Sequence, residues 1–284
     1  MSKEVEQKYE NKLKEALELG YKKLVAGDPS LSVVESVINL MEACSLFDAG
    51  RGSVVNDKGE VEMDSSIMEG TSYKAGAVGS VKKIKHPISL ARKVMDATPH
   101  VMLFGQGADE FGVKCGLETA SKDYFFTEPR HWEELVAKSS SAEGGKKLGT
   151  VGAVALDSSG TISAGCSTGG TTNKMQGRIG DSPIIGAGVY ADSKTCGVAC
   201  TGTGEFFIRG VVAHTVAALC EYKGLRIQEA VEQALKEKVE KLGGDGGIIA
   251  IDKGGNVGIV FNTTGMFRGY VGSDGTIKVF IDQH

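Results

Sequence analysis

The sequence predicts an α/β protein in which two sheets lie between pairs of helices. Two observations support this fold class. Apolar residues open the chain at helical spacing, and later short runs of Val, Ile and Ala alternate with Gly-rich turns. With 284 residues the chain can bury a full core, and it shows no internal repeat and no clear domain boundary. We therefore expect a single domain over residues 1–284, with helix pairs outside the two sheets.

Two amphipathic helices are expected first. Apolar side chains recur at helical spacing through residues 3–26, and a Gly-Asp-Pro run then ends this helix. Ser30 or Ser32 is expected to cap a second helix, which ends near Cys44. Ser32 with Glu35 has the spacing of a capping box.

The middle of the chain alternates strands and short helices. Strands are expected at residues 60–68, 73–81 and 101–104, and helices at 88–97, 109–115 and 129–137. Apart from Leu148, residues 138–148 are only Lys, Ser, Ala, Glu and Gly. This composition predicts a mobile linker, and a plain surface loop is the alternative.

The stretch from Gly149 to Glu205 is the most informative part of the sequence. It opens with an apolar run to Leu156 that predicts a strand buried on both faces, and a Ser-Ser-Gly turn leads to a second strand at residues 161–166. Gly, Thr and Ser then dominate up to Glu205. Such residues are poor core material, but they suit loops that bring backbone amides and hydroxyls close to a small ligand.

The C-terminal part predicts two more helices and three strands. One helix is expected at residues 205–222, with Val211 among its inward side chains, and another at 227–242. Strands are expected at 247–251, 257–261 and 277–281.

Composition disfavours several classes of protein. The net charge of −4, without a basic block, disfavours nucleic-acid binding. No apolar run approaches the roughly 18 residues of a membrane span, and the polar start lacks a signal-peptide core. A cytoplasmic location with reduced thiols is therefore expected. Six cysteines without a Cys-x-x-Cys pair disfavour zinc, and no nucleotide-binding Gly motif occurs.

Four short motifs occur in a fixed order within the informative stretch. They are Gly149-Thr150-Val151-Gly152, Ser167-Thr168-Gly169-Gly170, Gly177-Arg178-Ile179-Gly180-Asp181-Ser182-Pro183 and Thr201-Gly202-Thr203-Gly204-Glu205. The first alone is a weak signal, whereas the four together are specific. From about Ala16 to the C-terminus, the chain resembles the plant-type (type 2) L-asparaginases and isoaspartyl peptidases, which are threonine N-terminal-nucleophile hydrolases. The resemblance implies their four-layer αββα sandwich.

The resemblance implies that the chain cleaves itself between Gly149 and Thr150. Residues 1–149 and 150–284 would then be two subunits, α and β. The freed Thr150 would be the nucleophile, and its own α-amine, with an ordinary pKa of about 7.7–8.0, would be the base. The five histidines are scattered and form no Ser-His or Cys-His signature, which agrees with this chemistry. An ordinary strand threonine is the alternative.

Further positions match the motifs of the family. The resemblance implies that Thr168 forms a hydrogen bond near the nucleophile. It also implies that Thr201 and the amide of Gly202 form the oxyanion hole, in which a donor typically contributes about 2.7–4 kcal/mol.

Three more positions are expected to bind the substrate's amino-acid head group. By resemblance, Arg178 binds the α-carboxylate, Asp181 accepts from the α-ammonium, and the carbonyl of Gly204 contacts the same ammonium. An arginine fork suits a carboxylate better than a lysine does. A structural salt bridge is the alternative for Arg178 and Asp181.

The resemblance implies no catalytic metal and no organic cofactor. It does imply a structural sodium ion in the loop 40–53, held by backbone carbonyls. The candidate residues are Leu40, Glu42, Phe47, Ala49 and Arg51.

The chain departs from the family pattern at two places. The family has a first strand leading into His-Gly-Gly-Ala-Gly ahead of the first helix, and this sequence begins within the helix. Without that strand we expect an unpaired sheet edge, an open flank at Thr150, and slow or partial cleavage. Asp48 also stands where the family usually has Asn.

The expected function is hydrolysis of β-aspartyl peptides and of L-asparagine, with release of L-aspartate. The expected partners are these small substrates and a second copy in a homodimer of cleaved αβ units, with no nucleic acid and no membrane. Two alternatives stay open. A glycosylasparaginase shares the Gly-Arg-x-Gly-Asp-Ser-Pro run but differs in the two motifs around it. An unprocessed, non-catalytic paralogue would act as a dimer partner or regulatory scaffold.

Overall fold

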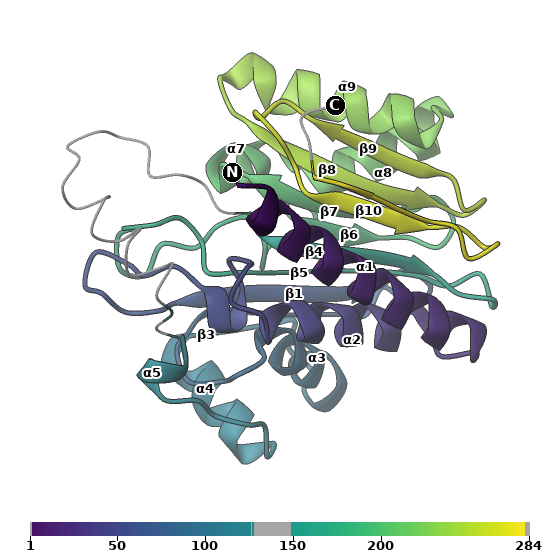
Figure 1. Ribbon diagram of the computed structural model, residues 1–284. Coiled ribbons are helices and arrows are strands. Elements are labelled where there is room, and N and C mark those ends of the chain that lie inside the picture. Colours follow the sequence, from purple (N-terminus) through teal and green to yellow (C-terminus); the bar gives the residue numbers. More distant parts are fainter. Residues whose placement is uncertain (1, 126, 128–148, 282–284) are drawn as a thin grey trace.

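The computed structural model describes residues 2–125, 127 and 149–281 and shows an α/β protein with mixed sheets (Figure 1). The α-helices are α1 (Lys3–Val25), α2 (Ser30–Glu42), α3 (Pro87–Ala97), α4 (Gly105–Lys114), α5 (Lys122–Phe125), α7 (Gly204–Gly210), α8 (Val212–Lys223) and α9 (Ile227–Lys238), with short 3₁₀ helices at Gly50–Gly52 and Glu240–Leu242. The strands are β1 (Met63–Glu69), β2 (Ala75–Val81), β3 (Met102–Phe104), β4 (Val151–Leu156), β5 (Ile162–Thr168), β6 (Val189–Ala191), β7 (Cys196–Gly202), β8 (Gly246–Asp252), β9 (Val257–Phe261), β10 (Arg268–Val271) and β11 (Ile277–Phe280). The expected helix at 129–137 and linker at 138–148 lie outside the described residues.

The first sheet has five strands in the order β3-β2-β1-β5-β4. All neighbours in it are antiparallel except β2 and β3, which are parallel. Its two central strands, β1 and β5, come from before and after residue 149, and their ladder pairs Asp64 with Thr168. Helices α2 and α3 pack against this sheet.

The second sheet is antiparallel, with the order β6-β7-β8-β9. Helices α8 and α9 pack against it, and strands β4 and β5 of the first sheet contact its strand β7. The two sheets therefore face each other, with α2 and α3 on one outer side and α8 and α9 on the other (Figure 1).

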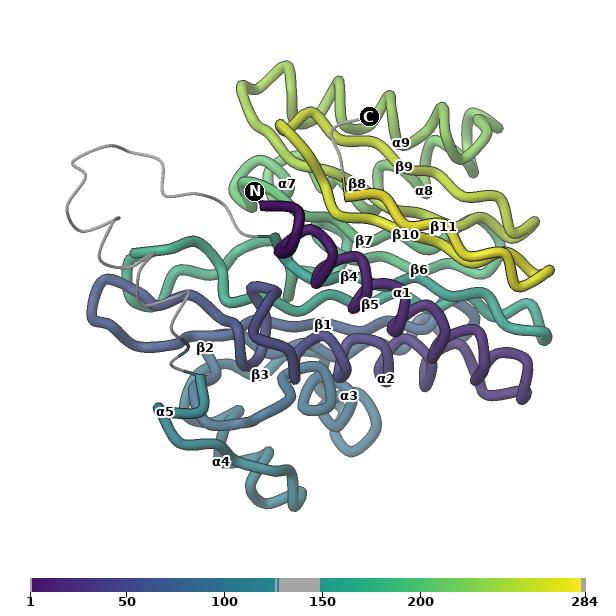
Figure 2. Tube along the Cα trace, viewed as in Figure 1, coloured from purple at the N-terminus to yellow at the C-terminus, as the bar shows by residue number. Residues whose placement is uncertain are grey.

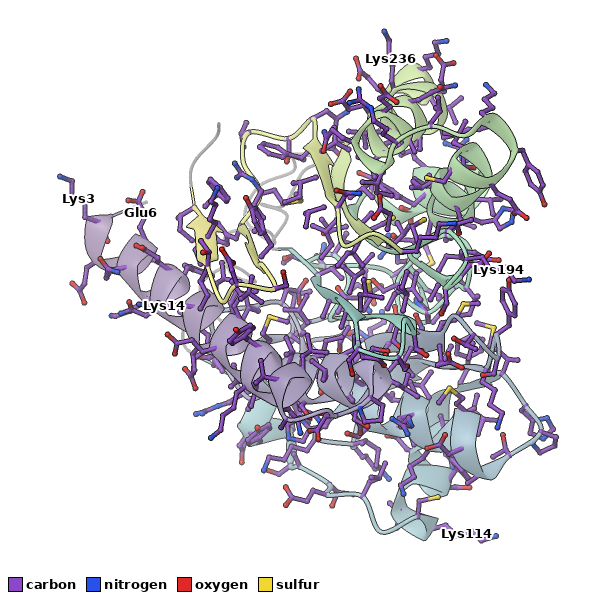
Figure 3. The ribbon with its side chains drawn as sticks, turned by 90° about the vertical axis from the view of Figure 1, so that its right-hand side faces the viewer. Lys3, Glu6, Lys14, Lys114, Lys194 and Lys236 are labelled. Atoms are coloured by element: carbon purple, nitrogen blue, oxygen red, sulfur yellow. The ribbon has the colours of Figure 1, made fainter. Side chains whose placement is uncertain are left out.

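The ends of the described chain lie together beside the sheets. Strands β10 and β11 form a separate antiparallel hairpin that packs on α1, although the two are far apart in sequence (Figure 2). On the other side of α1, Lys3, Glu6 and Lys14 point away from the protein (Figure 3). None of the described helices is both long and apolar enough to cross a membrane.

Small residues allow the two sheets to approach closely. A Cβ placed on Gly152 of β4 would lie 3.0 Å from the Cβ of Ala199 on β7. A Cβ on Gly197 of β7 would lie only 2.6 Å from Ile162 of β5. The glycines of the central stretch therefore set the distance between the sheets as well as shaping its loops.

The capping box expected at Ser32 and Glu35 is wrong. Helix α2 begins at Ser30, and neither serine caps it with its side chain. Instead the Oδ2 of Asp157, directly after β4, accepts a hydrogen bond from the Ser30 amide at 2.7 Å. A carboxylate from a distant segment thus takes the role that the local motif predicted for a serine.

The single helix expected at 205–222 is also wrong, because it is broken at Val211. This residue is in the left-handed region (φ 47°, ψ 50°) and is 47% exposed rather than inward. The first amides of α8, from Ala213 and His214, donate to the carbonyls of Ala187 and Gly186. These outside acceptors replace the intrahelical ones, so the chain turns and starts a new helix.

Other elements match the expected pattern less closely. Strand β4 is at the edge of its sheet and only partly buried, whereas the apolar run predicted burial on both faces. Strands β6, β7 and β10 were not predicted. The last long helix ends at Lys238, before a separate 3₁₀ turn, rather than continuing to Leu242.

Candidate active site

The site is built on the adjoining ends of strands β4 and β5. Because Val151 pairs with Ser167 in this ladder, Thr150 comes opposite Thr168. The Thr150 hydroxyl donates to Thr168 Oγ1 at 3.1 Å, and the Gly170 amide donates to the same Oγ1 at 2.9 Å. Thr168 is buried and Thr150 is half-buried, so the Thr150 hydroxyl is held by a fixed neighbour yet remains accessible.

Strand β7 brings Thr201 and Gly202 to the same place from the second sheet. A Cβ placed on Gly149 would lie 3.8 Å from Thr201 Oγ1, so the 149–150 peptide is beside this hydroxyl. Gly202 has a φ of +148°, and a Cβ there would overlap the carbonyl oxygen of Asp245. Only glycine fits this conformation and this space.

Asp181 lies against the start of α7, where a Cβ on Gly204 would be 2.9 Å from Asp181 Oδ1. Its carboxyl is buried, and Oδ2 has no hydrogen-bond partner among the described residues. Burial raises its pKa from 3.8 to about 7, although the nearby charge of Arg178 acts in the opposite direction. A buried carboxyl with an open acceptor is suited to receive a cation.

Arg178 is paired with Glu205, the last residue of the fourth motif. Its Nε and Nη2 donate to the two oxygens of this carboxylate at 2.9 Å each. Burial lowers the pKa of the guanidinium, but the hydrogen bond to Glu205 and its charge outweigh this effect and leave it raised. Arg178 therefore forms its ion pair with Glu205 and not with Asp181.

Of the five residues expected at a sodium ion, Leu40 and Glu42 lie in the last turn of α2, Phe47 and Ala49 in the loop that follows, and Arg51 in the 3₁₀ helix Gly50–Gly52. A Cβ on Gly50 would be 2.5 Å from the Glu42 carbonyl oxygen, and one on Gly52 would overlap the Phe47 carbonyl oxygen. The Ala49 carbonyl accepts a hydrogen bond from the Gly52 amide. Backbone carbonyl oxygens thus lie close to Gly50 and Gly52. Such neutral oxygens are among the ligands that a hard cation prefers. In the described ranges, no group of three or more His, Cys, Asp or Glu is placed to hold a metal.

Sequence reasoning missed three charged residues of this region: Glu205, Asp64 and Lys174. Glu205 is the last residue of the fourth motif, and Lys174 lies four residues after the end of the second; their charge was the available signal. Asp64 is fully buried in β1 at the position paired with Thr168. A charge within a strand whose neighbours are all buried could have identified it.

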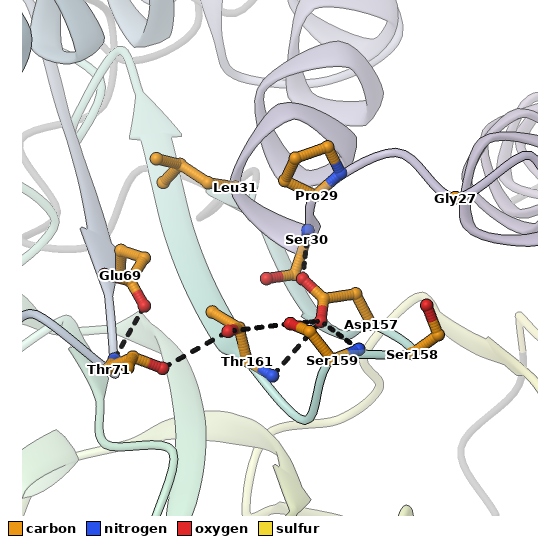
Figure 4. Close-up of a pocket in the computed structure, with 10 residues that line it drawn as sticks. All are labelled: Gly27, Pro29, Ser30, Leu31, Glu69, Thr71, Asp157, Ser158, Ser159 and Thr161. Carbon is orange, nitrogen blue, oxygen red and sulfur yellow. Dashed lines mark hydrogen bonds between the residues drawn. The ribbon is translucent and has the colours of Figure 1, made fainter.

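A separate hollow of about 450 Å³ lies at the far end of β4 and is lined by Asp157, Glu69 and several hydroxyls (Figure 4). Both carboxylates are used locally. Asp157 accepts from Ser30, Ser159 and Thr161, and Glu69 accepts from residues 71 and 72. The two carboxylates therefore stabilise local turns and the start of α2, and the hollow that they line lies away from Thr150.

Comparisons with known proteins agree with the motifs. Residues 1–281 match the family described as Asparaginase. The isoaspartyl peptidase of Salmonella typhimurium is 45% identical, over 99% of this chain and 93% of its own length. The isoaspartyl peptidase of Escherichia coli is 44% identical over 99% and 91%. The probable isoaspartyl peptidase/L-asparaginase 2 of Arabidopsis thaliana is 42% identical over 95% and 90%.

Proposed function

The chain belongs to the asparaginase family, and we therefore propose that it hydrolyses β-aspartyl (isoaspartyl) peptides and L-asparagine and releases L-aspartate. The observation that carries the proposal is the hydrogen bond from the Thr150 hydroxyl to Thr168 Oγ1. It fixes the Thr150 hydroxyl next to the Gly149–Thr150 peptide bond, which is the bond that this hydroxyl would attack. The fold we propose is the four-layer αββα sandwich of N-terminal-nucleophile hydrolases.

The proposed reaction begins within the chain. The Thr150 hydroxyl attacks the carbonyl carbon of Gly149, its proton passes to the Thr150 nitrogen, and the bond to that nitrogen breaks as an ester forms. Water then hydrolyses the ester, which leaves residues 1–149 with a carboxylate and Thr150 with a free amine. Thr201 and the Gly202 amide would stabilise the oxyanion at this step.

The freed Thr150 would then act on substrate. Its α-amine takes the hydroxyl proton as the oxygen attacks the side-chain carbonyl of the aspartyl group, and the same proton passes to the departing amine. An aspartyl-enzyme ester remains until water releases L-aspartate. In the precursor the Thr150 nitrogen is an amide and cannot act as this base.

Arg178, Asp181 and Gly204 would select the aspartyl group. Arg178 would bind the α-carboxylate, while the open oxygen of Asp181 and the Gly204 carbonyl would receive the α-ammonium. Two opposite charges at fixed separation match an amino-acid head group, so a peptide lacking either charge should bind poorly.

We also propose that carbonyls of the loop 40–53 bind a structural sodium ion, that two cleaved αβ units form a homodimer, and that the protein acts in the cytoplasm. The crowded carbonyls around Gly50 and Gly52 support the first of these proposals.

Intact-mass spectrometry and an aspartate-release assay test the proposed function together. We expect masses for residues 1–149 and 150–284, and release of aspartate from a β-aspartyl dipeptide that follows the cleaved fraction. A chain that stays whole after long incubation and releases no aspartate would instead support the non-catalytic scaffold.

A further inference from the structure

Arg178 is the last residue of a tight turn. Its amide donates to the Met175 carbonyl at 3.0 Å, and Gly177, at the third position of the turn, has a φ of +82°. A β-turn of this kind needs a positive φ at that position, which glycine adopts without strain. The amides of the two central residues, Gln176 and Gly177, have no acceptor within the turn, so their acceptors must come from elsewhere.

Two carboxylates from one distant segment accept these two amides. Asp57 accepts from the Gln176 amide through Oδ1 at 3.1 Å, and Glu62 accepts from the Gly177 amide through Oε2 at 2.9 Å. Glu62 is only 2% exposed, whereas Asp57 lies at the surface. Both central amides of the turn that leads to Arg178 are therefore held by side chains of the segment before β1.

The buried carboxyl of Glu62 is held as an anion. Burial raises its pKa, but the hydrogen bonds that it accepts, from the Gly177 amide first, and the charges of Lys82 and Lys174 outweigh this effect and leave the pKa lowered. Lys82 Nζ lies 3.6 Å from Oε1, while the other oxygen, Oε2, accepts from Gly177. A charged acceptor also binds an amide more strongly than a neutral one does.

Backbone hydrogen bonds hold the residues before the turn on the same segment. The Asn173 amide donates to the Val55 carbonyl at 2.9 Å, and the Asp57 amide donates to the Lys174 carbonyl at 2.8 Å. These bonds need no particular side chain, so they remain when Asp57 or Glu62 is replaced. The two carboxylates therefore fix the tip of the turn rather than its base.

The position of this turn affects how Arg178 can bind. Glu205 already holds one edge of the guanidinium through two hydrogen bonds of 2.9 Å. An arginine that starts from a displaced backbone cannot keep both bonds and still present its other edge at the same place. Thr150 and Thr168, in contrast, are held together at the β4–β5 ladder. A shift of the turn should therefore weaken binding and leave the nucleophile in place.

We propose that Asp57 and Glu62 are positioning residues for head-group binding: they hold the two central amides of the 175–178 turn and so place Arg178 for the substrate's α-carboxylate. This inference rests on the proposed function and gives neither residue a contact with substrate. Affinity for the aspartyl group should depend on whether residue 62 reaches the Gly177 amide, and cleavage after Gly149 should not.

Two conservative variants of Glu62 separate the reach of its side chain from its charge. Glu62→Asp keeps the charge but is one methylene shorter, so its carboxylate no longer reaches the Gly177 amide. We expect KM for a β-aspartyl dipeptide and Kd for L-aspartate to rise roughly 5- to 30-fold, with kcat and chain cleavage near wild type. Glu62→Gln keeps the length and an acceptor oxygen, so both constants should stay within about threefold of wild type. Steady-state kinetics, calorimetry and a denaturing gel measure these quantities.

A second variant and a control come from the same segment. Asp57→Ala should raise KM by roughly 2- to 5-fold, because water partly replaces an exposed acceptor. Glu60→Ala is the matched control. Glu60 pairs with Lys82 at 2.6 Å, its side chain is 43% exposed, and no hydrogen bond joins it to residues 175–178, all of which the structure describes. It should leave KM and Kd unchanged, because an exposed pair contributes little.

The order of the variants decides the inference. Reduced affinity in Glu62→Asp, with Glu62→Gln close to wild type, supports it. Unchanged affinity in Glu62→Asp overturns it, and so does a Glu62→Gln protein that is impaired as much. A loss of cleavage or of kcat as large as the loss of affinity also overturns it, because a general loosening of the fold would have that effect. If Glu62→Asp does not fold, Asp57→Ala decides: a rise in KM with normal cleavage supports the inference, and no rise overturns it.

The wild-type chain tests the proposed function separately. A wild-type chain that neither binds L-aspartate nor releases it would contradict the proposed function itself. A wild-type chain that does both, with variants that match it, would contradict only the roles of Asp57 and Glu62.

Discussion

Arg178 binds Glu205 through the side of its guanidinium group, with Nε and Nη2 each 2.9 Å from a carboxylate oxygen. A guanidinium presents a second pair of N–H groups along its Nη1–Nη2 edge. A Cβ on Gly180 would lie 3.0 Å from Nη1, so this edge is close to the loop that carries Asp181. Glu205 can therefore orient Arg178 without taking the edge that a substrate carboxylate would use.

Glu205→Gln should loosen Arg178 and raise KM. Glutamine keeps the shape and one acceptor but loses the charge and the bidentate pairing. Since Glu205 is 53% exposed, we expect a modest rise in KM of roughly 3- to 10-fold, with kcat nearly unchanged. Steady-state kinetics on a β-aspartyl dipeptide measure this. A fall in KM would show instead that Glu205 competes with the substrate for Arg178.

Arg178→Lys should impair catalysis strongly even though the charge is kept. Lysine is a point charge and cannot form the two parallel hydrogen bonds of a guanidinium. The loss of a bidentate charge-assisted pair is on the order of 2–3 kcal/mol, roughly 30- to 150-fold in kcat/KM. The comparison uses cleaved protein only. An unchanged kcat/KM would show that another residue binds the substrate carboxylate.

Substitutions of Thr150 should separate chain cleavage from substrate hydrolysis. Thr150→Ser keeps a hydroxyl and should still cleave, but more slowly without the methyl group that restricts χ1. Thr150→Cys should cleave yet hydrolyse substrate poorly, because its thiol and amine are differently matched. Thr150→Ala should do neither and still fold, since such a change typically costs about 1–3 kcal/mol. Gels and aspartate release are the measurements.

Thr161 offers a matched control within the same chain. Gly160-Thr161 also precedes a strand, β5, just as Gly149-Thr150 precedes β4. Thr161→Ala should leave cleavage and hydrolysis intact. Hydrolysis by a folded, uncleaved Thr150→Ala protein would mean that another residue carries out the chemistry.

Asp181 should make the protein less stable as the pH rises from about 4 to about 7. Its pKa in the folded protein is raised to about 7 from 3.8, mainly by burial, so the folded state holds a proton that the unfolded state has lost. The stability from this group is complete below about pH 4 and is lost as the pH rises through 7, at about 1.4 kcal/mol per pH unit at most. Asp181→Asn does not titrate, so urea unfolding of both proteins between pH 5 and 8 isolates the effect. Parallel curves would contradict it.

Val211→Gly should stabilise the protein. A β-branched residue in the left-handed region costs on the order of 1–2 kcal/mol, which glycine avoids at a smaller cost in chain entropy. We expect a net gain of about 0.5–1 kcal/mol in the free energy of unfolding. Val212→Gly, one residue later in a buried helical position, should destabilise it. Thermal unfolding would contradict the prediction if Val211→Gly melted lower than wild type.

Local pattern predicted much of the fold and part of the site. The helical spacing of residues 3–26, the paired strands at 60–68 and 73–81, and the strand after Gly149 could all be read from the sequence. Thr150 and Thr168 are brought together by one hairpin, so their motifs already implied closeness.

The remaining features depend on contacts between distant segments. Strand β7 consists of Cys, Gly, Val, Ala and Thr, because the closely packed sheets require small residues. Such residues do not show the alternation of apolar and polar side chains by which a strand is predicted. The partners of Arg178 and Asp64 are 27 and 116 positions away, so no spacing rule could pair them. The same holds for the Asp157 carboxylate at α2.

The first sheet combines strands from both sides of the proposed cleavage site: β1 to β3 precede residue 149, whereas β4 and β5 follow it. A cut between Gly149 and Thr150 would leave two polypeptides interleaved in one sheet, with Asp157 of one holding the start of α2 in the other. Refolding of the cut protein from denaturant would then require the two polypeptides to meet, which is a second-order step. Dilution would slow it for the cut protein, while the uncut chain would regain its sheet at a rate independent of concentration.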